Sequence, residues 1–390
     1  MHIAVVSRNL IKGDGQGRVN YEVVKRSLKR GNKVTVYSSN IEKDLLEHPL
    51  FNWVRINVDK VPTALLKVQY FAIKSYLKLR QDKKSIDILL VNGFITWSKS
   101  DFNAVHFVHS EWIKSSVHPI KNKLTINSIY QFLYTFINSK LERISFKQSK
   151  VLIPVSEKVK NELIKSARVK PNSKIMTIFN GVDINEFSPY KKVVKNIETP
   201  PNQVIALFTG DIKTNRKNLD SVLKSIKDVP NLFLLIAGST DGSPYPQMVK
   251  KMGLEEKVTF LGFKKNISEL MNQADFFLFP SRYEACSLVV LEALSSGLPV
   301  VTTTQSGLAE LIEDKEGSGG FIIDNPENIL SITKAVTTLV NNKNIRETMS
   351  QNARRIAEKN TWSFMADTYI NYFEDETENK KSMELIANES

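Results

Sequence analysis

Two glutamates, Glu284 and Glu292, stand with seven residues between them in the stretch 279–301, FPSRYEACSLVVLEALSSGLPVV. The stretch opens at the end of an apolar run, passes through a short polar loop, and resumes at Ser287 with the apolar spacing of a helix. It therefore predicts a strand, a loop that carries Glu284, and a helix that carries Glu292.

The start of this predicted helix supplies a second kind of chemistry. Backbone N–H groups around Ser287 to Val289 have no partner within the helix, and they form a positive terminus that suits a phosphate group. A nucleotide sugar has the matching layout, because its hydroxyl groups at both ends can donate to carboxylates and its diphosphate lies between them. One loop could hold such a molecule.

The pattern Glu284-x7-Glu292, followed by GLPVV at 297–301, resembles the E-x7-E signature of the retaining glycosyltransferases of family 4 (GT4, glycosyl transferase group 1), which have the GT-B fold. The resemblance implies that Glu284 contacts hydroxyls of the donor sugar and has a catalytic role, while Glu292 holds the ribose. The implied donor-binding residues of this stretch are Ala285, Cys286, Ser287, Leu288, Val289 and Glu292.

Length and composition fit a globular protein of two domains. The chain has 390 residues, of which 42% are hydrophobic and 24% charged. No apolar run reaches 18 residues, and the opening MHIAVVS predicts a strand in place of an export signal, so a cytoplasmic protein is expected. Cys286 is the single cysteine, which excludes internal disulfides; it is interpreted as a small buried residue.

Charge is distributed unevenly along the chain. Residues 1–190 contain 31 Lys and Arg against 15 Asp and Glu, whereas the remaining 200 contain 23 against 26. The first domain alone is basic.

The N-terminal segment predicts a Rossmann-like unit. A strand at 3–6 is followed by a glycine-rich loop at 12–18, a helix at 19–30 and a second strand at 34–37. The spacing G-x-G-x-G and the lack of an acid after the second strand argue against nicotinamide binding. In the family named above, a loop at this place approaches the donor's phosphates and the acceptor, and Gly15, Gln16 and Gly17 match it.

The segment VHFVHS at 105–110 predicts a strand that ends at His109, where ligands gather in a doubly wound sheet. His106 and His109 would face opposite sides of that strand, which argues against a zinc site. By resemblance, His109 lines the donor-sugar pocket and is a catalytic candidate, whereas His106 packs.

Two predicted helices, at 65–80 and 124–150, mix aromatic and aliphatic residues with lysines and arginines. Three interpretations remain open. Their apolar faces could be core with solvated lysines, they could rest on an anionic membrane, or they could bind nucleic acid, although no nucleic-acid module accompanies them.

The polar, proline-containing residues 188–203 predict a linker. The first domain is expected to span 1–188 and the second 189–363. By resemblance, a C-terminal helix at about 364–390 crosses back to the first domain, and the charged tail after Glu374 is expected to fray.

The second domain offers cations for a departing diphosphate. Arg216 and Lys217 stand where the family's basic residues meet the diphosphate, and they are catalytic candidates. The sequence has no D-x-D triplet, so we expect no metal site and no divalent cation requirement; fixed cations would stabilise the leaving group. Further donor contacts are predicted at the ends of strands: Gly210, Gly238, Gly262 and Phe263.

Together these features predict an α/β protein of GT-B fold, with two Rossmann-like domains facing an interdomain cleft. The expected function is retaining transfer of a hexose from a nucleotide sugar, with UDP-glucose or a close relative preferred, to a glycan or lipid-linked acceptor. A GDP-mannose-dependent mannosyltransferase and a non-catalytic nucleotide-sugar-binding protein remain alternatives, and a GT-B phosphorylase would need a pyridoxal phosphate lysine and a longer chain. No cofactor and no nucleic-acid partner is expected, and the basic first domain suggests an anionic membrane surface as a partner.

Overall fold

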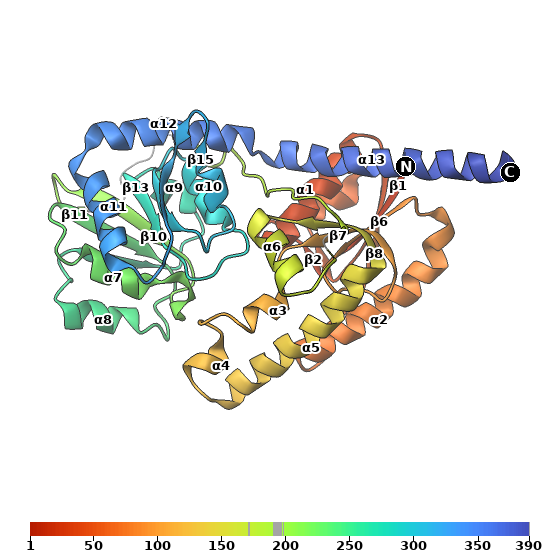
Figure 1. Ribbon diagram of the computed structural model, residues 1–390, viewed down its shortest axis with the longest axis horizontal. Helices are drawn as coiled ribbons and strands as arrows, with labels where there is room; N and C mark the ends of the chain where they lie inside the picture. The colour runs from red at the N-terminus through yellow and green to blue at the C-terminus, as the bar shows by residue number, and fades with distance from the viewer. Residues whose placement is uncertain (171, 190–196, 198, 390) are drawn as a thin grey trace. The chain divides into compact units, whose positions relative to one another are not determined.

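The structure is a computed structural model that describes residues 1–170, 172–189, 197 and 199–389 (Figure 1). The chain divides into two compact units: Met1–Gly181 together with Trp362–Ser390, and Val182–Thr361. The boundaries between the units, after Gly181 and after Thr361, lie a few residues before the domain boundaries predicted after 188 and after 363. Of the predicted linker, residues 190–196 and 198 lie outside the described residues.

The first unit is built on a parallel sheet. Within the described residues it has seven strands in the order β5-β3-β1-β6-β7-β8-β9. Every residue of β6 is buried, as expected for a strand whose sheet is covered by helices on both faces. The strands are β1 (His2–Val6), β3 (Lys33–Ser38), β5 (Phe51–Arg55), β6 (Ile88–Asn92), β7 (Ser100–Val105), β8 (Ser149–Pro154) and β9 (Lys174–Ile175).

Helices cover both faces of this sheet. Figure 1 shows α2 and α5 on one side and α1 with α13 on the other. Phe71 and Leu79 of α2 belong to a buried cluster with strand residues such as Ala4 and Val91. The helices are α1 (Gly15–Lys29), α2 (Ala64–Asp82), α3 (His109–Trp112), α4 (Pro119–Asn122), α5 (Ile126–Gln148), α6 (Glu157–Lys165) and α13 (Trp362–Glu389); the short strands β2 (Asn9–Leu10) and β4 (Asn40–Ile41) pair beside them.

The second unit repeats the same design. Its described residues form a six-stranded parallel sheet in the order β12-β11-β10-β13-β14-β17, whose central strands are fully buried apolar runs such as LFLLIA and FFLF. The strands are β10 (Val204–Thr209), β11 (Leu232–Ala237), β12 (Val258–Gly262), β13 (Phe276–Phe279), β14 (Val300–Thr303) and β17 (Gly320–Ile323). The helices are α7 (Leu219–Ile226), α8 (Tyr245–Met252), α9 (Ile267–Met271), α10 (Leu288–Ser295), α11 (Ile329–Asn341) and α12 (Lys343–Lys359); β15 (Glu313–Asp314) and β16 (Gly317–Ser318) form a small hairpin.

The strand before His109 was predicted wrongly. β7 ends at Val105 and begins at Ser100, and His109 opens the helical turn α3. The start of β7 was not predicted because its first residues are polar. Hydrogen bonds allow these residues to be buried: the Ser100 hydroxyl donates to Ser149 Oγ at 2.9 Å, and Asn103 Nδ2 donates to the Gly93 carbonyl at 3.2 Å.

Two helix ends also differ from the prediction. α1 begins at Gly15, so Gly15, Gln16 and Gly17 form its first turn and do not belong to a loop. α13 runs from Trp362 to Glu389, past Glu374, after which a fraying tail was expected. Ion pairs join its part up to Lys380 to the rest of the first unit: Glu374 pairs with Arg30, Glu376 with Lys150, and Lys380 with Asp101.

Candidate active site

The loop that carries Glu284 follows β13 and leads into α10. As predicted, Glu284 lies on the loop and Glu292 within the helix, which Ser287 precedes as its N-cap. The Glu284 N–H donates to the Gln305 carbonyl at 3.0 Å, and the Gly307 N–H donates to the Glu284 carbonyl at 3.0 Å. These two bonds fix the Glu284 backbone against the segment that follows β14.

Glu284 forms an ionic cluster with the two predicted cations. Arg216 Nη1 lies 2.6 Å from Glu284 Oε1, and Lys217 Nζ contacts the same oxygen. Only 10% of the Glu284 side chain and 13% of the Lys217 side chain are exposed. Burial lowers the pKa of Lys217 from its ordinary value, although the Glu284 carboxylate opposes this shift. The cluster thus joins an acid predicted to bind sugar hydroxyls to cations predicted to bind a diphosphate.

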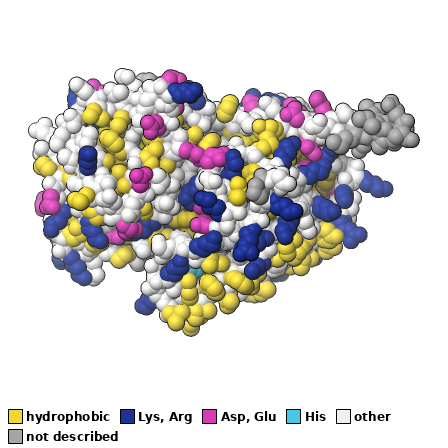
Figure 2. Space-filling model, in the orientation of Figure 1, with side chains coloured by type: hydrophobic (Ala, Val, Ile, Leu, Met, Phe, Trp, Pro, Cys, Tyr) yellow, Lys and Arg dark blue, Asp and Glu magenta, His cyan; other side chains and the backbone are white. Residues whose placement is uncertain are grey.

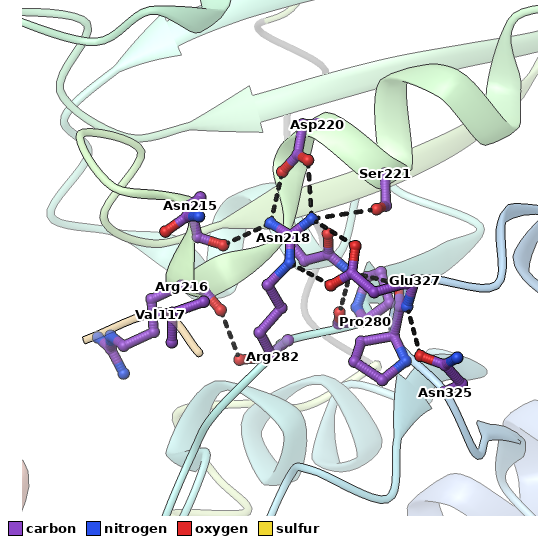
Figure 3. Close-up of polar contacts among 12 residues, drawn as sticks. Val117, Asn215, Arg216, Asn218, Asp220, Ser221, Pro280, Arg282, Asn325 and Glu327 are labelled. Carbon is purple, nitrogen blue, oxygen red and sulfur yellow. Dashed lines mark hydrogen bonds and ion pairs between the residues drawn. The ribbon is translucent and has the colours of Figure 1, made fainter. Parts of the chain in front are cut away.

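Arg282 holds the two loops of this cluster together (Figure 3). Its guanidinium binds both Asp220 oxygens, at 2.7 and 2.8 Å, and both Glu327 oxygens, at 2.5 and 2.9 Å. Its backbone N–H donates to the Arg216 carbonyl at 2.9 Å. Burial works against the charge, yet the hydrogen bonds to Asp220 and Glu327 raise the pKa of Arg282 above its ordinary value.

Asn218 makes a second tie between the same loops. It stands in the left-handed backbone region, with φ of 67°, directly before α7. Its Nδ2 donates to the Pro280 carbonyl at 2.8 Å and to the Pro326 carbonyl at 2.7 Å (Figure 3). The position of Arg216 and Lys217 is therefore set by Asn218 and Arg282 on either side of them.

Of the predicted strand-end glycines, Gly210 lies beside the Lys217 side chain, and Gly238 approaches Gly210. A Cβ on Gly238 would stand 2.5 Å from the Gly210 carbonyl oxygen, so the close approach of two neighbouring strand ends requires a glycine there. Gly238 also donates its N–H to the Gly262 carbonyl at 3.0 Å. Phe263, the predicted base contact, is 74% exposed. These positions stay predictions, since packing alone accounts for Gly238.

Several buried hydroxyls around the cluster have no hydrogen-bond partner within the described residues: Thr209 Oγ1, Ser287 Oγ and Ser306 Oγ. Thr209 ends β10, Ser287 precedes α10, and Ser306 pairs its backbone with Glu284. Buried polar atoms are normally hydrogen-bonded, so these three hydroxyls are available to a water or ligand that reaches them. Ala285 is buried, Cys286 is half-buried, and Leu288, Val289 and Glu292 are half-buried on the first turns of α10.

In the first unit, a buried glutamate positions His109. Glu142 of α5 is 5% exposed; its Oε2 accepts the His109 N–H at 3.0 Å and its Oε1 lies 2.6 Å from His109 Nδ1. Because a carboxylate accepts hydrogen bonds and does not donate them, Nδ1 is the protonated nitrogen in this contact. Glu142 was not singled out from the sequence, where it reads as one more charge on a helix.

His106 belongs to a separate polar network. Its Nε2 lies 3.1 Å from Asn92 Oδ1, and Asn92 also exchanges hydrogen bonds with Asn20 of α1. Burial lowers the pKa of His106 to about 4, so the ring is neutral at pH 7. This network ties α1 to the strand ends beside its first turn, where Gly17 leaves no room for a side chain because a Cβ would stand 2.9 Å from the Ile11 carbonyl oxygen.

Comparison with known families assigns both units. The family described as Glycosyltransferase Family 4 matches residues 13–186, and the one described as Glycosyl transferases group 1 matches residues 190–356. The chain belongs to the family 4 glycosyltransferases. The resemblance first carried by the E-x7-E pattern is confirmed, and with it a transferase.

Relatives and solved structures agree with this assignment. An uncharacterized glycosyltransferase of Methanocaldococcus jannaschii is 30% identical over 260 residues, an alignment that covers 63% of this chain and 64% of that protein. The structure of WaaG, a glycosyltransferase involved in lipopolysaccharide biosynthesis, superposes with a TM-score of 0.73 at 19% identity and covers 95% of this chain and 99% of WaaG. The Anabaena protein HepE in complex with UDP and glucose gives a TM-score of 0.67 at 18% identity, over 96% and 100% of the two chains. These likenesses confirm two Rossmann-like domains of GT-B type in this glycosyltransferase.

The sequence predicted the members of one cluster of the candidate site and missed the residues that support it. Arg216, Lys217 and Glu284 were predicted separately, and the structure brings them together. His109 and Gly15 to Gly17 belong to the first unit. Arg282 was missed although it stands two residues before Glu284, and its signal, an arginine just after a buried strand, is shared by many surface loops.

Proposed function

We propose that this protein transfers a hexose, with retention of the anomeric configuration, from a nucleotide diphosphate sugar to a glycan or lipid-linked acceptor. The observation that carries the proposal is the buried cluster of Arg216, Lys217 and Glu284 beside the start of α10, with Glu292 inside that helix. The two cations and the N–H groups at the start of α10 suit a diphosphate. The two carboxylates suit the hydroxyl-bearing groups on either side of that diphosphate.

In this proposal the cations stabilise the leaving group. Breaking the bond between the sugar C1 and the phosphate oxygen puts negative charge on the nucleoside diphosphate, and Arg216 and Lys217 already stand fixed by Arg282 and Asn218. Preorganised charges of this kind are worth about 3 kcal/mol of barrier each. The protein is proposed to work without a divalent metal, because these two side chains supply the positive charge.

The acceptor oxygen is proposed to attack C1 on the face that the phosphate leaves. The new C1–O bond forms on that face, and the acceptor's hydroxyl proton passes to the departing diphosphate. Glu284 would then orient the sugar through its hydroxyls, and His109, whose Nδ1 is bound by Glu142, would contact the sugar through Nε2. This same-face course is that of the family.

The proposed donor is UDP-glucose or a close relative, supported by the fold likeness to a protein solved with UDP and glucose. A GDP-mannose-dependent mannosyltransferase is the alternative, and a non-catalytic nucleotide-sugar-binding protein would keep the same contacts without turnover.

No described helix is both long and apolar enough to span a bilayer. We propose a cytoplasmic protein that works at the inner face of the cell membrane.

Thermal unfolding with UDP, GDP and ADP, each with and without a chelator, tests the donor site. Ligand at a hundred times its dissociation constant adds about 2.7 kcal/mol to the domain that binds it. We expect UDP to stabilise the wild-type protein with the chelator present, and Glu292→Ala to abolish the effect. Glu255→Ala, an exposed glutamate after α8, is the matched control. Stabilisation by none of the three, or equal stabilisation of Glu292→Ala, would contradict the site.

A product assay separates the enzyme from a binding protein. UDP release from UDP-glucose, followed with and without candidate glycan or lipid-linked acceptors, should occur in the wild type. Stabilisation by UDP without any turnover of UDP-, GDP- or ADP-sugars would favour the non-catalytic alternative.

A further inference from the structure

The helix α5 is amphipathic in the reverse of the usual sense. Its buried side chains are mostly polar, whereas a surface helix of a globular protein normally buries its apolar stripe. Its exposed side chains are large and apolar, between 36% and 90% exposed: Ile126, Ile129, Leu133, Phe136, Ile137 and Ile144. Core packing therefore does not explain why these residues are apolar.

The neighbouring helix α2 carries a matching stripe. Leu66, Tyr70, Ile73 and Leu77 recur at helical spacing, so they lie on one face, and each is between 39% and 49% exposed. The two helices are joined where the Leu65 N–H donates to the Tyr130 hydroxyl at 3.2 Å. Figure 2 shows hydrophobic side chains gathered over this part of the first unit. We call the two stripes together the α2/α5 face.

Cations border the α2/α5 face. Lys74, Lys78, Lys140 and Lys147 are exposed, and Lys74 and Lys140 lie over the rings of Tyr70 and Phe136 at 5.5 and 5.2 Å. The carboxylates in 64–82 and 119–148 are Asp82, which lies at the C-terminal end of α2 and accepts from the Tyr37 hydroxyl, and Glu142, which is buried on His109. Neither lies among these lysines in the middle of the two stripes.

We propose that the α2/α5 face docks on an anionic lipid bilayer, with its apolar side chains in the acyl boundary and its lysines at the headgroups. Lipid suits both features, because acyl chains take the aliphatic side chains and anionic headgroups take the ammonium groups. A second copy of the chain would bring like charges together across the face. Nucleic acid would match the lysines but gains nothing from isoleucine and leucine, since bases stack on aromatic rings.

This inference rests on the proposed function for its purpose, since docking would bring a lipid-linked acceptor to the first unit. The docking itself depends on different residues from those that bind the donor. Vesicle binding and donor binding can therefore be lost independently of each other.

Vesicle sedimentation tests the docking. Full-length protein is mixed with vesicles of phosphatidylglycerol and phosphatidylcholine, or of phosphatidylcholine alone, at low and at high salt. We expect binding to the anionic vesicles at low salt, weaker binding at high salt, and little binding to neutral vesicles. Failure to bind anionic vesicles at low salt would overturn the proposal.

Two pairs of variants locate the surface. Ile73→Glu with Leu133→Glu should lower the partition coefficient at least tenfold, whereas Leu330→Glu, an 82% exposed leucine on α11, should leave it unchanged. Lys74→Ala with Lys140→Ala should lower it about thirtyfold at low salt, equal to about 2 kcal/mol at about 1 kcal/mol per basic residue. The control for these is Lys250→Ala with Lys251→Ala on α8. Test variants that bind like their controls would overturn the proposal.

Two readouts separate the other outcomes. Stabilisation by UDP should survive in the α2/α5 variants and vanish in Glu292→Ala, which should still bind vesicles; this keeps a failed docking distinct from a failed donor site. Light scattering that shows a dimer dissociated by Ile73→Glu with Leu133→Glu, or binding of oligonucleotides in place of vesicles, would overturn the lipid assignment.

Discussion

The polar clusters beside the two sheets use different ionisable groups. In the second unit, carboxylates are paired with arginine and lysine: the buried Glu284 with Arg216 and Lys217, and the partly buried Asp220 with Arg282. In the first unit, Asn92 and Glu142 hold the imidazoles of His106 and His109. A guanidinium stays charged at every physiological pH, whereas an imidazole does not. The second unit thus pairs its carboxylates with fixed cations, whereas the first unit holds imidazoles through an amide and a carboxylate.

The strongest test of the fixed charges is Arg282→Ala. It leaves Asp220 without its partner in a largely buried site, and breaking such a pair costs about 3–5 kcal/mol of unfolding free energy. Urea unfolding measures the loss. Arg355→Ala is the control, since its pair with Asp314 is more accessible, with 25% and 30% of the two side chains exposed, and it should change stability less. Equal losses of unfolding free energy in the two variants would contradict the greater contribution expected of the Arg282–Asp220 pair.

Lys217→Ala should affect activity more than stability. Glu284 keeps Arg216 as a partner, so the fold retains a balanced charge. The proposed leaving group loses one cation, which costs about 3 kcal/mol of barrier, or more than a hundredfold in the transfer rate. UDP release under saturating donor measures this. Lys213→Ala, exposed in the same loop, should be as active as the wild type; full activity of Lys217→Ala would contradict the proposed role.

The first unit should lose stability in acid through His106. Its pKa is lowered to about 4 by burial, whereas an unfolded histidine titrates near 6.5. Between these values the unfolded chain binds the extra proton, so the unfolding free energy falls as the pH falls from about 6.5 to about 4. The loss is at most about 3 kcal/mol, because one pKa unit corresponds to about 1.4 kcal/mol.

Urea unfolding of the wild type and of His106→Gln at pH 7 and pH 4.5 measures this difference. Glutamine can keep a hydrogen bond to Asn92 but does not titrate, so it should flatten the pH dependence. An unchanged slope in His106→Gln would assign the acid sensitivity to other groups.

Glu142→Gln should lower the transfer rate by less than Lys217→Ala does. Glutamine keeps an acceptor for His109 but removes the charge-assisted bond, which is worth about 1.5–3 kcal/mol, or ten- to a hundredfold in rate. The pH profile of kcat should shift with it, while KM for the donor stays within a few fold. Glu111→Gln on α3 is the control. A rate loss without any change in the pH profile would indicate a merely structural glutamate.

Patterns that depend on near neighbours in the sequence were predictable. Buried strands such as β11 and β13 are continuous apolar runs, and the E-x7-E spacing places one acid on a loop and the other on a helix. The two repeated sheets follow from these runs and from the family resemblance.

Features that depend on distant partners were not predictable. β7 is a strand because Ser100, Asp101 and Asn103 find hydrogen bonds up to 49 residues away along the chain, and no local pattern reports those bonds. Arg282 and Glu142 matter through what they face, namely Asp220 and His109, and a charged residue in one sequence does not reveal what it faces. The ion pairs of α13 with Arg30, Lys150 and Asp101 likewise join residues far apart in the sequence.

The return of α13 to the first unit has a consequence for biosynthesis. Its residues Met365, Tyr369, Ile370 and Phe373 are buried, Phe373 packs against Phe102 of β7 with ring centroids 4.8 Å apart, and Asp367 pairs with both Arg26 and Arg30 of α1. These residues leave the ribosome after the whole of the second unit, so the first unit translated is the last to be completed. Until then its α1 side exposes apolar surface, and a nascent chain that stalls before residue 362 would present that surface to chaperones.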